Sequence, residues 1–139
     1  MKKEALTREN TQWGEVFYDY CGLWKSAGLE IKTEKMLGSY QGDIVALLYD
    51  PETKLWAYGH TGYGSCPGCD AYQACEDSIN EIEELRDSLV DGLIWNNAAA
   101  MLAWLKEKDW GQEYFSENDG DFKEWLNNSI ETLEKEESC

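Results

Sequence analysis

Two apolar runs joined by a short turn constrain this fold more than any other feature of the sequence. The runs "QGDIVALLYD" and "KLWAYGH" are apolar and partly alternating, and the intervening "DPET" begins at Asp50-Pro51, a pair typical of a turn. The runs therefore predict two antiparallel strands joined as a hairpin. The preceding segment, residues 29–37, predicts a third strand that extends the same sheet.

Helices are predicted both before and after these strands. Apolar residues recur at helical spacing over residues 12–26, over residues 71–90, after a cap at Asn97, and in a last helix that contains "FKEWLNNSIETL". A chain of 139 residues suits one domain. We therefore expect a single α+β domain over residues 1–139, in which a small antiparallel sheet of about three strands packs with about four α-helices.

The third predicted strand runs directly into a stretch dense in cysteine, "GHTGYGSCPGCDAYQAC". Its "CPGC" centre is a C-x-x-C turn in which both thiols can point the same way. Zinc requires four sulfur or nitrogen ligands in a tetrahedron, and a knuckle at a strand–helix junction can supply them. The predicted zinc ligands are Cys66, Cys69, Cys75 and His60, with Cys21 as the alternative to His60.

Two other interpretations of these cysteines stay open. A C-x-x-C turn between a strand and a helix is also where thioredoxin-like enzymes carry their redox cysteines, although no βαβ pattern precedes this one. Cys75, near the start of a predicted helix, would gain thiolate character from the helix dipole. The thiols could equally be unliganded, as we expect for Cys139.

Neither a signal peptide nor a membrane-spanning apolar run is found in the sequence, so we expect a cytoplasmic protein with reduced cysteines. Cys66 or Cys69 with His60 could pair a thiol nucleophile with a base. However, no Gly-rich phosphate loop, G-x-S-x-G or H-E-x-x-H motif accompanies them. We therefore predict that the protein is not an enzyme.

The formal net charge of −16 is concentrated in the second half of the chain. Residues 1–69 carry seven Lys/Arg and nine Asp/Glu, whereas residues 70–139 carry five and nineteen, a balance of −14. Such a surface repels nucleic acid and anionic membranes and favours a basic partner. The alternative is that the charge serves only solubility. The predicted partner-binding residues form a stripe on the helix after the cysteine loop: Asp77, Glu81, Glu84, Asp87 and Asp91.

Two segments, "YGSCPGCDAYQAC" and "LIWNNAAAMLAWLKEKDW", resemble the core of a group of small phage-encoded proteins with a G-S-C-x-G-C-D signature. Within that group the chain is similar to acidic anti-CRISPR proteins that act on type II systems, over residues 40–114. Cys66, Cys69 and Cys75 are the matching positions. The resemblance implies a zinc-containing DNA mimic in the host bacterial cytoplasm, which binds a basic RNA-guided Cas nuclease and blocks target-DNA binding or cleavage. If the acidic helix is not the binding surface, the aromatic loop around Trp110, Tyr114 and Phe115 is the next candidate.

Overall fold

A computed structural model describes residues 1–38, 42–64, 70–76, 78–112 and 120–137. It confirms the predicted α+β class, because the described residues form a four-stranded antiparallel sheet and five α-helices. The elements are α1 (Tyr20–Ser26), β1 (Glu30–Gly38), β2 (Gly42–Asp50), β3 (Leu55–Tyr63), α2 (Ala71–Ala74), α3 (Ile79–Asp91), β4 (Ile94–Asn96), α4 (Ala98–Glu107), a short 3-10 helix η1 (Trp110–Gln112), and α5 (Gly120–Glu137).

The strands lie in the sheet in chain order, β1-β2-β3-β4, and each neighbouring pair is antiparallel. The predicted hairpin is β2–β3, whose turn places Asp50 opposite Leu55. β4 has no counterpart among the predicted strands. It has three residues and pairs with β3 only from Trp56 to Tyr58. A run that short carries too little alternation to be recognised from sequence.

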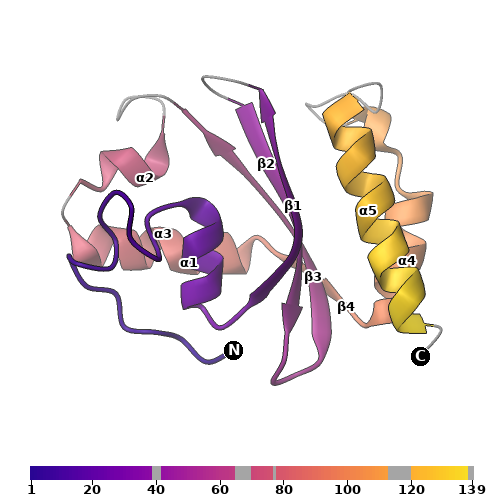
Figure 1. Cartoon of the computed structure of the whole chain (residues 1–139), viewed down its shortest axis with the longest axis horizontal. Coiled ribbons are helices and arrows are strands. Elements are labelled where there is room, and N and C mark those ends of the chain that lie inside the picture. The colour runs from indigo at the N-terminus through magenta and orange to yellow at the C-terminus, as the bar shows by residue number, and fades with distance from the viewer. Residues whose placement is uncertain (39–41, 65–69, 77, 113–119, 138–139) are drawn as a thin grey trace.

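Helices cover both faces of the sheet, so the molecule has three layers, with α1 and α3 on one side and α4 and α5 on the other (Figure 1). Ile44, Ala46 and Leu48 of β2 belong to the first core, against α1 and α3. Val45 and Leu47 belong to the second core, against α4 and α5. Because β2 is buried on both faces, its sequence is a nearly continuous apolar run. In the described part of the chain, no helix has both the length and the apolar composition that crossing a bilayer requires.

A β-bulge allows β1 to contribute to both cores. Ile31 pairs with Leu48 and Thr33 pairs with Leu47, so the residue between them is extra. An extra residue moves every later side chain to the other face of the sheet. Ile31 accordingly packs on the first core, whereas the Thr33 hydroxyl lies 2.6 Å from the hydroxyl of Ser129 on α5.

The first predicted helix, over residues 12–26, is wrong in its first half. α1 begins only at Tyr20 and is capped by Asp19, whose side chain accepts a hydrogen bond from a backbone N–H of the first turn at 2.6 Å. Trp13 and Val16 are 82% and 68% exposed, so their helical spacing does not mark a buried face.

The second predicted helix, over residues 71–90, is divided into α2 and α3. The break falls at Glu76, whose φ of 50° lies outside the helical region. α3 begins after Ser78, whose hydroxyl accepts a hydrogen bond from the backbone N–H of Glu81 at 3.3 Å. The third predicted helix is confirmed as α4, with Asn97 as its N-cap, and the last as α5.

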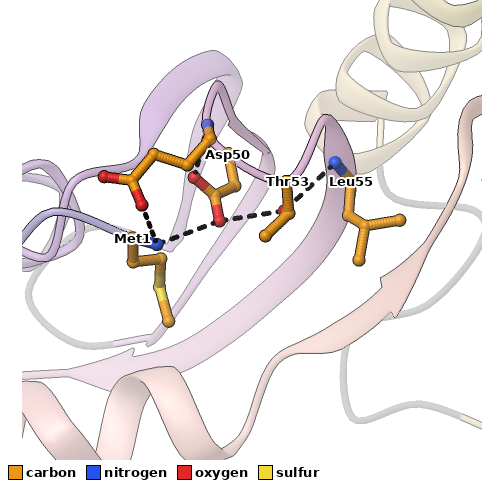
Figure 2. Close-up of polar contacts among 5 residues, drawn as sticks. Met1, Asp50, Thr53 and Leu55 are labelled. Atoms are coloured by element: carbon orange, nitrogen blue, oxygen red, sulfur yellow. Dashed lines mark hydrogen bonds and ion pairs between the residues drawn. The ribbon is translucent and has the colours of Figure 1, made fainter.

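The buried carboxylate of Asp50 organises the β2–β3 turn and binds the amino group of Met1 (Figure 2). The Met1 nitrogen lies 3.3 Å from Oδ2 of Asp50 and 3.3 Å from Oε2 of Glu52. The Thr53 hydroxyl donates to Asp50 Oδ2 at 3.0 Å and accepts from Leu55 N at 3.4 Å. Burial alone would raise the pKa of Asp50, but the backbone N–H of Glu52, the Thr53 hydroxyl and the Met1 ammonium hold that pKa below its ordinary value.

Candidate functional site

The cysteine loop is closed at its base by hydrogen bonds between its two described ends, Gly64 and Asp70. The backbone N–H of Gly64 donates to Asp70 Oδ2 at 2.9 Å, and Gln73 Nε2 donates to the Gly64 carbonyl at 3.0 Å. Cys66 and Cys69 lie outside the described residues. The closure therefore places the end of β3 beside the start of α2, whatever the cysteines between them bind.

Asp70 joins three parts of the fold although it is only 6% exposed. Its Oδ1 accepts from the hydroxyl of Tyr20 on α1 at 2.7 Å and from the backbone N–H groups of Tyr72 and Gln73 at 2.9 and 3.1 Å. Burial and the hydrogen bond to Asp70 raise the pKa of Tyr20. Asp70 is not among the residues predicted to have a role, although Asp directly before a helix is a recognisable N-cap signal.

His60 and Cys75 lie on opposite faces of the sheet. His60 is paired across the strands with Val45, which belongs to the second core, and directly opposed residues project from the same face. Cys75 is buried in the first core. The His60 ring is held instead by Asp43, with Nε2 at 2.7 Å from Oδ1. The structure therefore does not bring His60 to Cys75 as a shared ligand pair.

Cys75 is not placed at a helix N-terminus, which corrects the expected stabilisation of its thiolate. It is the C-cap of α2, and its Sγ donates to the carbonyl of Ala71 at 3.3 Å. Burial, followed by the charges of Glu81, Asp70 and Glu84, raises the pKa of the Cys75 thiol. An unliganded Cys75 is therefore a weak nucleophile at neutral pH.

Cys21, the alternative zinc ligand, is buried in the same core as Cys75. Its Sγ donates to Oε2 of Glu34 at 2.5 Å, and burial together with this hydrogen bond raises the pKa of the thiol. Among the residues that the structure describes, no three His, Cys, Asp or Glu side chains are grouped as metal ligands. The zinc site stays a prediction that depends on Cys66 and Cys69.

The acidic stripe lies on α3 and faces solvent. Glu81, Glu84, Asp87 and Asp91 are all exposed, as predicted, whereas Asp77 lies outside the described residues. Asp87 forms an ion pair with Lys3, 3.1 Å from Nζ to Oδ1. In the described ranges the other three exposed carboxylates of the stripe have no ion-pair partner.

The carboxylates of α5 differ, because lysines neutralise several of them. Each of three lysines, from β1, α4 and α5 itself, lies within 4.0 Å of an α5 glutamate. The pairs are Lys35–Glu124 at 3.4 Å, Lys106–Glu134 at 3.3 Å and Lys135–Glu131 at 3.3 Å. Unbalanced negative charge is therefore a property of the α3 face more than of the α5 face.

The prediction that Trp110 belongs to an alternative aromatic binding surface is wrong. Trp110 is 3% exposed and belongs to the second core, where its Nε1 donates to the carbonyl of Leu105 at 3.1 Å. Tyr114 and Phe115 lie outside the described residues. The exposed tryptophan of the described chain is Trp13, at 82%.

Trp13 borders a pocket of about 540 Å³ between the loop before α1, the strands β1 and β2, and the base of the cysteine loop. Its aromatic wall consists of Trp13, Tyr18, Tyr20, Tyr63 and Tyr72. The pocket has no signal in the sequence, because its residues come from distant segments that meet only in the folded chain.

No known family model, curated protein or solved structure matches this chain.

Proposed function

We propose that this protein is a non-catalytic acidic inhibitor, which binds a basic protein and keeps nucleic acid from the surface it occupies. The sequence resemblance suggests the class of partner. It is a type II CRISPR nuclease of the bacterial host, whose DNA channel is positively charged. The observation that supports the proposal is the set of exposed carboxylates on α3 that have no ion-pair partner among the described residues.

The α3 charges are suited to electrostatic recognition. Glu81 and Asp91 are ten residues apart, about 15 Å along a helix. Duplex DNA presents one charge per ~1.7 Å of axis, so α3 imitates part of a duplex and not its full density. Carboxylates without neutralising lysines keep their potential, which speeds encounter with a basic groove and fixes register.

α3 is also held rigidly, as placement of charge requires. Its inner face contributes Ile82 and Leu89 to the first core. Arg86, its one basic residue, turns inward: Nη1 donates to the carbonyl of Glu4 at 2.8 Å and to the hydroxyl of Ser26 at 3.2 Å. The Arg86 charge is therefore buried and leaves the outer face negative.

Zinc would add a further fixed point beside α3. In this proposal Cys66, Cys69 and Cys75 hold the ion, and His60 or Cys21 is the fourth ligand. Cys21 is the better placed of the two relative to Cys75, because both are buried in the first core. The role of the metal is structural: it ties the end of β3 to α2, next to the closure made by Asp70.

The test is a DNA-cleavage assay with a purified type II nuclease and guide RNA, accompanied by pull-down of the nuclease. We expect inhibition by the wild-type protein that weakens steeply as salt rises, because the complex is charge-steered. Reversal of Glu81, Glu84 and Asp91 to Lys should abolish inhibition without loss of the folded state, since all three are exposed.

A charge-matched control is available on α5, where Glu131, Glu134 and Glu136 are also exposed. Their reversal to Lys changes the net charge by the same amount and should leave most of the inhibition. Equal loss in both triple variants would indicate that only net charge matters. Full inhibition by the α3 variant would show that α3 is not the binding surface, and no binding by the wild type would refute the proposed partner.

A further inference from the structure

The pocket behind Trp13 has aromatic walls. Tyr18 contacts Trp13 edge-to-face, with ring centroids 5.0 Å apart, and lies 5.7 Å from Tyr72. Tyr20 meets Tyr72 edge-to-face at 6.0 Å. At the mouth, Met36 is 57% exposed. Large apolar side chains left this exposed around one hollow are typical of an interaction site.

The charged residues that line the pocket are all acidic in the part of the chain that the structure describes. Glu15 and Asp19 lie at its rim and Asp70 at its base, and no Lys, Arg or His is among its described lining residues. The Asp70 carboxylate is buried, yet the four donors that bind it from described residues are all neutral groups. Buried charges are normally paired with an opposite charge.

A cation inside the pocket would meet two kinds of attraction. The faces of Tyr and Trp rings attract cations through their quadrupoles. The carboxylates of Glu15 and Asp19 can only accept hydrogen bonds. Asp19 Oδ1 already accepts from the backbone N–H of Gly22, so its second oxygen and the Glu15 carboxylate would accept hydrogen bonds from a cation that carries N–H groups. The volume of about 540 Å³ admits one long side chain with the backbone that carries it.

We propose that this pocket binds an arginine side chain presented by a partner polypeptide. A guanidinium is planar, stacks on aromatic rings and donates in a fork to carboxylates, and so uses both the walls and the rim. A quaternary ammonium has no N–H donor and would use only the walls. The pocket is separate from the α3 stripe, so the proposal stands without the nuclease assignment.

The probe is the peptide Gly-Gly-Arg-Gly-Gly, blocked at both ends and titrated into ¹⁵N-labelled protein. We expect saturable shifts of the Trp13 indole N–H and of the amides of Gly14 and Gly64, which line the pocket. The matched control replaces arginine by citrulline, which has nearly the same shape but no charge, and should give no saturable shift. Equal binding of both peptides would refute a cation site.

Two variants and their controls test the residues. Trp13→Ala should weaken binding about two- to fivefold, as expected for a partly exposed cation–π contact. Val16→Ala, at a position that is also exposed but lies outside the pocket lining, should not change it. The double variant Glu15→Gln/Asp19→Asn should weaken binding about tenfold, and it keeps the α1 cap because Asn caps as well as Asp.

The control for the double variant is Glu4→Gln/Glu9→Gln, which removes the same charge from exposed positions elsewhere. Unchanged affinity in both pocket variants would overturn the proposal. Tighter binding of a trimethyl-lysine peptide would also overturn it, in favour of a quaternary ammonium site. Shifts centred on α3 instead of Gly14 and Gly64 would show unspecific attraction to the acidic surface.

Discussion

Replacement of Asp70 by alanine removes one acceptor group and leaves without it the four hydrogen-bond donors that bind it from the described residues. These donors are the Tyr20 hydroxyl and the backbone N–H groups of Gly64, Tyr72 and Gln73, at 2.7 to 3.1 Å. Only the Tyr72 N–H keeps another acceptor, because it also lies 3.1 Å from the Tyr20 oxygen.

The expected loss of stability is about 3–5 kcal/mol. A buried donor left without an acceptor costs about 1–3 kcal/mol, and contributions within one network do not add fully. Removal of a buried carboxylate that has no cationic partner among the described residues also relieves a desolvation cost, which offsets part of the loss. Asp70→Asn retains Oδ1 but turns an amide group toward Gly64 N–H, so it should cost only about 1–3 kcal/mol.

Thermal and urea unfolding at neutral pH measure these differences. At about 3 °C per kcal/mol for a domain of this size, Asp70→Ala should lower Tm by about 10–15 °C and Asp70→Asn by about half of that or less. Glu84→Ala, on the exposed face of α3, is the control and should stay within about 0.5 kcal/mol of wild type. A loss below about 1 kcal/mol in Asp70→Ala would refute the role assigned to this carboxylate at the base of the loop.

Three further predictions concern other parts of the molecule. The pKa of Asp50 is lowered in the folded state, so its stabilising contribution is complete above its unfolded pKa of about 3.9 and is lost as pH falls through the lower folded value. Asp50→Asn should therefore flatten the acid limb of the unfolding free energy against pH. Gly59→Ala should lower the free energy of unfolding, measured by chemical denaturation, by about 1–3 kcal/mol, because the new Cβ would lie 2.8 Å from Cζ2 of the Trp24 ring. A denaturation midpoint equal to that of the wild type would show that the first core repacks around the added methyl group without cost. Protein purified without chelators should contain about one zinc per chain by elemental analysis, and Cys66→Ser should lose the metal and melt earlier; metal-free wild type would exclude the zinc knuckle.

Local signals in the sequence were sufficient for most of the elements. The "DPET" turn predicted the hairpin, and Asn97 predicted the start of α4. Two boundaries that were predicted wrongly also had signals, in the caps Asp19 and Ser78, and Ser78 precedes Glu81 by three residues as a capping box does. Apolar spacing is the weaker signal at Trp13, because an exposed aromatic residue can recur at helical spacing without packing against a core.

The candidate sites, like the helices and strands, were predictable from the sequence only where a local pattern marks them. The exposure of Glu81 and Glu84 followed from helical periodicity, because charged residues opposite the apolar face of an amphipathic helix point to solvent. The aromatic pocket did not follow from any local pattern, since Trp13, Met36 and Tyr63 come from three segments that only tertiary packing brings together. The separation of His60 from Cys75 likewise required the strand register, which decides the face on which each side chain lies.

The way α5 returns to β1 has a consequence for the order of folding. Each strand of the sheet pairs with its neighbour in the chain, and the β2–β3 turn needs only the segment from Asp50 to Leu55 to close. The contact of Thr33 with Ser129 instead joins residues 96 positions apart. The entropic free-energy cost of closing this long loop exceeds the cost of closing the hairpin by about 2–3 kcal/mol. We therefore expect the hairpin-connected strands to form first and α5 to dock last. The second core would then become fully packed only when α5 docks. The α5 amides should be among the first helical amides to exchange with solvent.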